Sequence, residues 1–193
     1  MPMLKVWVPD TTSWETYTAA KFTDRVVQKW VNSHMAKGMP IAEPLPEIVV
    51  QVEGEYPPAD FFACVTIRIV SITIKRILES FVNQGVQFFP VVILDRDRGP
   101  TLKQYFFMHI VEKVPCFDWE KSECRIGVLS DGSRHIVAID RLVLLPVDTV
   151  EHPLFKVAEV SQFILCVDDG IAQRILDAGC TGGAFRHPSE TRW

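Results

Sequence analysis

The sequence lacks the features by which nucleic-acid-binding, secreted and membrane proteins are recognised. Its 193 residues include 20 Lys and Arg against 24 Asp and Glu, and no Lys/Arg-rich run occurs. Because phosphate binding requires a basic face, the net charge of −4 argues against a nucleic-acid partner. Residues 1–10 hold no apolar stretch of signal-peptide length, and no run approaches the length of a membrane span. We therefore expect a cytoplasmic protein that binds neither nucleic acid nor membrane.

Cysteine is scarce, and its spacing suggests neither disulfides nor a metal site. The five cysteines form no CxxC pair and lie in or beside apolar runs: Cys64, Cys116, Cys124, Cys166 and Cys180. Structural zinc sites need closely paired ligands, so we expect no metal. Free, mostly buried thiols in a reducing compartment are the expectation.

Sequence signatures of catalysis are also missing. The chain has no GxSxG, no HExxH and no P-loop, and the glycines of residues 179–185 follow an expected helix rather than open one. We therefore predict no catalytic, cofactor-binding or metal-binding residue, no cofactor and no enzyme activity. One alternative stays open, an enzyme or small-ligand-binding domain whose site is assembled from residues distant in sequence. Its mark would be a deep pocket that gathers His109, His135 or Asp118.

What is present is the composition of an ordinary globular protein, with 48% hydrophobic and 23% charged residues. A chain of this length buries roughly 70% of its unfolded surface, so its core needs no disulfides. We predict three parts: an N-terminal appendage of residues 1–59, a main domain of residues 60–187 and a loose tail of residues 188–193.

The predicted appendage contains little regular structure. Residues 4–8 and 48–52 are expected strands, and residues 23–37 have the apolar spacing of an amphipathic helix. Thr23 can cap this helix and Gly38 can end it. The prolines that punctuate residues 39–58 favour irregular backbone through most of that segment.

The predicted main domain is organised around residues 61–94. Residues 65–70 form an expected strand, and Ser71 then suits the N-cap of a helix over 72–84 that Gly85 ends. Residues 86–94 resume as a strand. Both strands are apolar on both sides, which predicts a buried centre.

The remaining elements follow in order. Residues 104–111 are apolar on both faces, which predicts a central strand. Residues 124–129 and 135–145 flank the polar turn 130–133 and predict a hairpin. A strand at 162–167 precedes a helix over 169–178, which Asp168 or Asp169 can cap and Gly179 can end. We predict an α+β fold with a mixed, mainly antiparallel sheet, two capped helices packed on it and a small N-terminal appendage.

Positive charge is absent from one long stretch. Between Gly38 and Ile67 there is no Lys or Arg, while five acidic residues fall there: Glu43, Glu47, Glu53, Glu55 and Asp60. A second group, around an expected turn, combines three acidic residues with one tryptophan: Asp118, Glu120, Glu123 and Trp119. Ordinary solvated surface, with Asp118 bonded to turn amides, accounts for these residues. The functional interpretation is a docking face for a basic protein partner.

Several short motifs occur in a fixed order between residues 60 and 187: Asp60-Phe61-Phe62, Ser71, Ile77-Leu78, Phe89-Pro90-Val91, Tyr105, Cys116-Phe117-Asp118, Ser122, Ile139-Asp140-Arg141-Leu142, Pro153-Leu154-Phe155, Thr181-Gly182 and Phe185. Their order resembles that of a family of bacterial immunity proteins, first described as a domain of unknown function and belonging to polymorphic toxin systems. The resemblance implies a protein that binds and neutralises a cognate toxin without catalysis. It implies no contact residue, no toxin chemistry and no oligomeric state.

Overall fold

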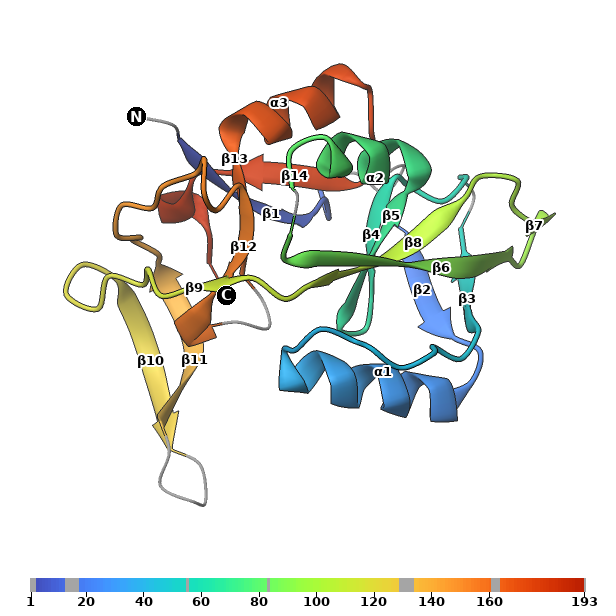
Figure 1. The fold of residues 1–193 in the computed structure, drawn as a ribbon, viewed down its shortest axis with the longest axis horizontal. Helices are drawn as coiled ribbons and strands as arrows, with labels where there is room; N and C mark the ends of the chain where they lie inside the picture. Colours follow the sequence, from blue (N-terminus) through green and yellow to red (C-terminus); the bar gives the residue numbers. More distant parts are fainter. Residues whose placement is uncertain are drawn as a thin grey trace. The chain divides into compact units, whose positions relative to one another are not determined.

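The computed structural model describes residues 3–12, 18–54, 56–82, 84–128, 134–160 and 164–192 (Figure 1). The chain divides into two compact units. The large-sheet unit comprises Pro9–Val111 and Gln173–Ala184, and the small-sheet unit comprises Met1–Val8, Glu112–Ala172 and Phe185–Trp193. The domain boundary predicted near residue 59 stays a prediction. Among the described helices, none has both the length and the apolar character that crossing a membrane requires.

The large-sheet unit is built on a seven-stranded sheet with the order β2-β3-β6-β8-β5-β4, in which β7 pairs with β6. Its strands are β2 (Ala19–Phe22), β3 (Ile48–Glu53), β4 (Phe61–Cys64), β5 (Ile67–Ser71), β6 (Val86–Asp95), β7 (Gly99–Pro100) and β8 (Tyr105–Ile110). Only β3 and β6 pair in parallel among these strands. The central position predicted for residues 104–111 is confirmed, because β8 lies between β6 and β5.

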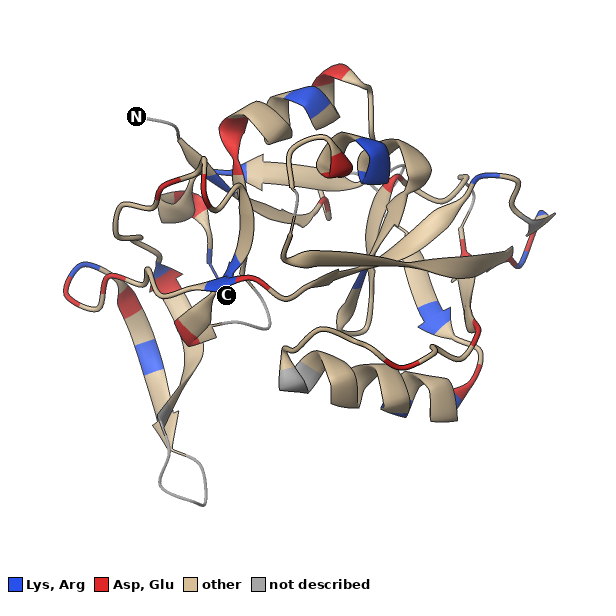
Figure 2. Cartoon of the chain, in the orientation of Figure 1, with Lys and Arg blue, Asp and Glu red and all other residues tan. Residues whose placement is uncertain are grey.

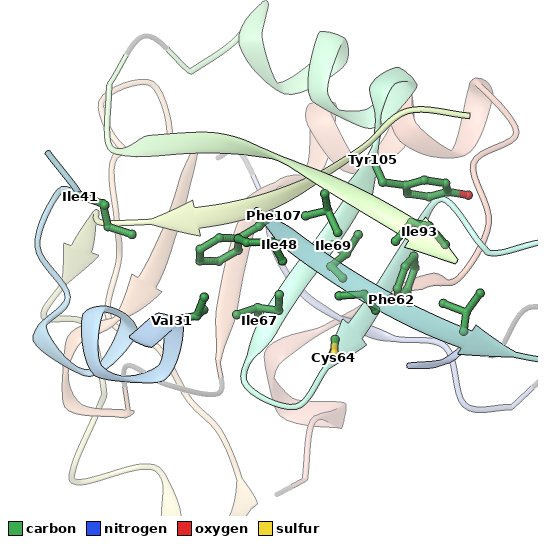
Figure 3. Packing of buried hydrophobic residues seen from close by; sticks show 13 residues of the cluster. Val31, Ile41, Ile48, Phe62, Cys64, Ile67, Ile69, Ile93, Tyr105 and Phe107 are labelled. Carbon is green, nitrogen blue, oxygen red and sulfur yellow. The ribbon is translucent and has the colours of Figure 1, made fainter. Parts of the chain in front are cut away.

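One face of this sheet packs into a hydrophobic cluster with helix α1 (Arg25–Lys37) (Figure 3). β3 alternates buried and half-buried residues, so Ile48, Val50 and Val52 point into the cluster. Val31 of α1 and Phe107 of β8 are fully buried in it. Each such side chain contributes roughly 1.5–3 kcal/mol through burial, which makes this cluster the main support of the unit.

The N-cap of α1 differs from the prediction. The cap is Asp24 rather than Thr23, because the Asp24 carboxylate accepts hydrogen bonds from the Val26 and Val27 amides at 2.6 and 3.4 Å. The Thr23 hydroxyl instead donates to the Val49 carbonyl of β3. Gly38 ends the helix in the left-handed conformation, as predicted.

Helix α2 (Ile72–Glu79) packs on β5 and β8. The Ser71 cap is confirmed, since its hydroxyl accepts from the Ile74 amide at 3.5 Å. The helix ends at Glu79, earlier than predicted, and Gly85 lies in the turn before β6. Ser80 marks the end: its hydroxyl and its amide both bond to the Ile77 carbonyl, and such local bonds compete with helix propagation.

The strand predicted at residues 65–70 is wrong at its start. Val65 and Thr66 form the turn between β4 and β5, and Val65 has a φ of 56°, which is rare for a β-branched residue. The expectation that both strands are buried on both faces is wrong for β6. Val92 and Leu94 are exposed on the face opposite the hydrophobic cluster.

A five-stranded sheet with the order β14-β1-β13-β12-β9 has most of its strand residues in the small-sheet unit. Its strands are β1 (Leu4–Pro9), β9 (Lys113–Val114), β12 (Leu154–Val157), β13 (Leu165–Asp168) and β14 (Gly183–Arg186). β10 (Glu123–Val128) and β11 (Arg134–Arg141) form a separate antiparallel pair, which confirms the predicted hairpin. The predicted turn at 130–133 and the first residues of the predicted strand 162–167 lie outside the described residues.

The C-terminal part contains helix α3 (Asp169–Asp177) and the 3-10 turns η1 (Ala158–Val160) and η2 (Pro188–Glu190). Asp168 is the capping residue of the two predicted candidates, because its carboxylate accepts from the Gly170 amide at 2.8 Å. Gly179 follows the helix with a φ of 68°. In the segment expected to be a loose tail, Thr191 is buried. The α+β class with mainly antiparallel strands is confirmed, although the strands form three sheets instead of one.

Candidate partner-binding surfaces

The connection between α1 and β3 carries two open carboxylates. Glu43 and Glu47 are both exposed there, and Figure 2 shows acidic but no basic residues along the stretch that leads into β3. The Nε2 of His34 lies 3.9 Å from the Glu43 carboxylate. The Glu43 side chain is 73% exposed, so its carboxylate stays accessible to solvent despite this contact. Both residues can therefore attract a basic partner.

Glu53 lies on β3 and is already paired. Its carboxylate is 2.8 Å from Lys21 of β2 and 3.6 Å from Arg96, which follows β6. The hydrogen bond and charge of Lys21 hold the pKa of Glu53 below its usual value. Glu53 therefore offers little unneutralised charge. Glu55 lies outside the described residues.

Asp60 is an interior residue rather than a surface one, with an exposed fraction of only 8%. Its carboxylate accepts hydrogen bonds from the Ser71 hydroxyl at 2.5 Å, from Lys103 Nζ at 2.6 Å and from the Thr181 amide at 3.2 Å. Burial by itself would raise the pKa of Asp60, but these donors outweigh it and keep the pKa below its usual value. Asp60 joins the start of β4 to the cap of α2 and to the segment after α3, so we remove it from the contact surface.

The second acidic group surrounds a turn in the small-sheet unit. Asp118 is buried and accepts from the amides of Glu120 at 3.1 Å and Lys121 at 3.0 Å, which confirms the structural interpretation of this residue. Burial would raise the pKa of Asp118, but these amides and Lys121 lower it overall. Its carboxylate is therefore committed to the turn.

The neighbours of Asp118 are accessible. Trp119 is 54% exposed and rests edge-on against Phe117 with ring centroids 4.7 Å apart. Glu120 is exposed, and Glu123 at the start of β10 pairs with Arg141 at 3.0 Å. Trp119 and Glu120 therefore remain candidates for contact. The structure places these residues in the small-sheet unit and the residues of the first acidic group that it describes in the large-sheet unit.

An apolar groove in the small-sheet unit was not predicted from the sequence. It has a volume of about 570 Å³ and is lined by residues from three segments: Met3, Leu4, Leu142–Asp148 and His187–Ser189. The segment Leu142–Asp148 follows β11, and its Leu144 forms an isolated bridge with Phe117. The apolar run LVLLPV at residues 142–147 is the sequence feature that indicates this groove. Its first residues fall at the end of the strand predicted at residues 135–145.

The β10–β11 hairpin was predicted, but its exposed apolar side chains were not singled out. Ile126, Val128 and Val137 are all exposed, on strands that pair only with each other among the described residues. Exposed β-branched side chains on an isolated strand pair are typical of interaction surfaces.

The two histidines of the alternative interpretation belong to different compact units and differ in exposure. His109 is fully buried in β8, and its Nε2 donates to the Met39 carbonyl at 2.9 Å, so it is a satisfied core residue. His135 is exposed on β11. Within the part of the chain that the structure describes, no group of three or more His, Cys, Asp or Glu side chains could hold a metal ion.

Comparison with known proteins identifies the family. A search of curated proteins found no match. The model of the immunity protein family Imm11 matches residues 12–190, which extends well N-terminal of the motifs that carried the sequence resemblance and includes segments of both compact units. A match of this length confirms the immunity-protein resemblance: the chain belongs to the Imm11 immunity protein family.

Proposed function

We propose that this protein binds a cognate bacterial toxin and neutralises it by forming a stoichiometric complex, without catalysis. The observation that carries the proposal is the family match over residues 12–190. An immunity protein is made in the cell that it protects, so we place it in the cytoplasm, within a polymorphic toxin system.

A tight complex requires a few buried anchors surrounded by polar groups. Trp119 and the exposed side chains of the β10–β11 hairpin are anchors of the required kind. Open carboxylates add long-range attraction to a basic partner, which raises the association rate and weakens as salt rises. Glu43 and Glu47 fit this role best, and Glu120 and Glu123 are further candidates.

The alternative, an enzyme or small-ligand-binding domain, finds less support. His109 and Asp118 are each committed to internal hydrogen bonds that hold the fold. Substrate turnover by the isolated protein would favour this alternative over stoichiometric binding.

The test first requires a neighbouring reading frame that encodes a large secreted protein with a toxic C-terminal domain. Co-expression of that domain with this protein should restore growth, and the two should co-purify. Growth arrest despite an abundant, folded protein would contradict the proposed function.

The acidic contribution is tested separately, with the double variant Glu43→Lys/Glu47→Lys. Both positions are exposed, so the fold should persist while association slows about tenfold at low salt and less at high salt. A matched control, Asp97→Lys/Asp177→Lys, changes the charge equally at exposed positions of the same unit. Equal slowing by both variants would show that the effect depends only on net charge. Unchanged association of the Glu43/Glu47 variant would show that these two residues do not contribute to binding.

A further inference from the structure

The apolar groove of the small-sheet unit has the construction of a receptor site for a side chain. Its walls come from the segment Leu142–Asp148, from the start of β1 and from the turn at η2. Its volume of about 570 Å³ lies within the range of ligand-binding pockets. The groove is therefore large enough to receive an apolar side chain.

The lining is apolar along most of its length and is accessible from outside. Met3 is 56% exposed and Leu145 is 46% exposed, and both line the groove. The Leu145 amide donates to the Cys116 carbonyl at 2.7 Å. This hydrogen bond fixes the backbone, while the side chain can still change its conformation. An apolar side chain entering here would displace water from both residues without rearranging the backbone.

The charged groups that line the groove are negative. Asp148 is the one residue among the lining side chains with a full negative charge, and Lys and Arg are absent from this set. Its Oδ1 accepts from the Val150 amide at 2.9 Å and the Glu151 amide at 3.4 Å, so the carboxylate is held in place by the turn. Glu151 is itself exposed, which adds negative charge at the same turn. A cation is the complementary group for this end of the groove.

We propose that the groove receives an apolar side chain of the cognate toxin, next to a Lys or Arg of the toxin that pairs with Asp148. This proposal rests on the proposed function and names the surface on which it acts. The favoured occupant is a protein segment because an apolar slot beside one carboxylate matches the anchor-and-rim pattern of protein interfaces. A second copy of this chain and a small molecule are the competing occupants.

Two variants separate the two parts of the site. Leu145→Asn removes the apolar contact and should weaken toxin binding at least tenfold, mainly through faster dissociation. Asp148→Asn keeps an acceptor for the turn amides and removes the charge, so association should slow by severalfold at low salt and little at high salt. Leu102→Asn is the matched control, because Leu102 is fully exposed in the large-sheet unit and lies outside the groove.

A measurement on the unmodified protein guards against variants that fail to fold. Hydrogen exchange of the amides in 142–148 should slow when the toxin binds. Wild-type affinity of Leu145→Asn, or unchanged exchange in this segment, would overturn the groove proposal and leave the proposed function intact as long as the wild-type protein binds toxin. Protection of 142–148 in toxin-free protein at rising concentration would assign the groove to a second copy, and displacement of toxin by a co-purifying small molecule would assign it to a ligand. If the wild-type protein binds no toxin, both proposals fail together.

Discussion

Lys103 Nζ lies 2.6 Å from Oδ1 of Asp60, and this ion pair joins the chain just before β8 to the chain just before β4. The Asp60 side chain is 11% exposed and the Lys103 side chain 39%, so water screens the pair only from one side. The same carboxylate bonds the cap of α2 and the segment after α3. Asp60 therefore stabilises the junction of four segments in the large-sheet unit.

Replacing Asp60 with Ala should destabilise the protein by about 3 kcal/mol, because buried donors lose their acceptor and Lys103 loses its partner. The Asp97→Ala variant, at an exposed position in the same unit, should stay within about 0.5 kcal/mol of wild type. Urea unfolding of both variants measures the difference. Similar midpoints for the two variants would show that Asp60 does not stabilise the junction.

The same residue predicts a dependence of stability on pH. The pKa of Asp60 is lower in the folded chain than its ordinary value of 3.8, so the unfolded chain binds this proton first as the pH falls. The stabilisation is therefore complete above about pH 4 and is lost as the pH falls below that value. Thermal melts of wild type and Asp60→Asn from pH 7 to pH 2.5 should converge at the acidic end. Parallel curves would contradict the assignment, since other carboxylates titrate equally in both proteins.

Ser71 has two roles, and its replacement should show both. Its hydroxyl caps α2 and donates to Asp60, and the residue is fully buried. Ser71→Ala should therefore cost about 2 kcal/mol, more than the ~1 kcal/mol of a cap alone. Ser80→Ala, which removes an exposed hydroxyl bonded to the Ile77 carbonyl, should cost far less. If Ser71→Ala and Ser80→Ala lowered the free energy of unfolding equally, Ser71 would have neither of these two stabilising roles.

The cysteines should react according to their burial. Burial raises the pKa of Cys64 and Cys116 to about 12 and that of Cys180 to about 11, and it raises the pKa of Cys166 further still. Thiolates are the reactive form, so these thiols should resist iodoacetamide at pH 8 in the native protein and react after denaturation. Mass spectrometry of alkylated peptides measures this. Rapid native labelling of Cys166, or a disulfide in fresh protein, would contradict the structure and the cytoplasmic assignment.

Local signals were sufficient for some elements. The Ser71 cap, the central strand at 104–111 and the β10–β11 hairpin depend on neighbouring residues and on apolar patterning, which a single sequence displays. The β4–β5 turn was missed because Val65 and Thr66 carry no Gly, Asn or Pro to mark it.

The candidate surfaces depended on contacts that sequence spacing does not reveal. The sequence does not reveal that Asp60 is buried, because one of its donors, Thr181, lies 121 residues away. The groove likewise combines the N-terminus, the segment after β11 and the C-terminal turn. Exposed Glu43 and Glu47 were predicted correctly as surface residues because the proline-rich segment around them has no apolar pattern.

The central claim is that one molecule of this protein inactivates one molecule of toxin. The most direct measurement titrates the purified protein into a fixed amount of the purified toxic domain and follows both the heat of binding and the residual toxin activity. Heat and activity should reach their end points together at one equivalent, with a complex of matching mass. Absence of binding at micromolar concentrations, or loss of toxin activity at amounts far below one equivalent, would contradict it.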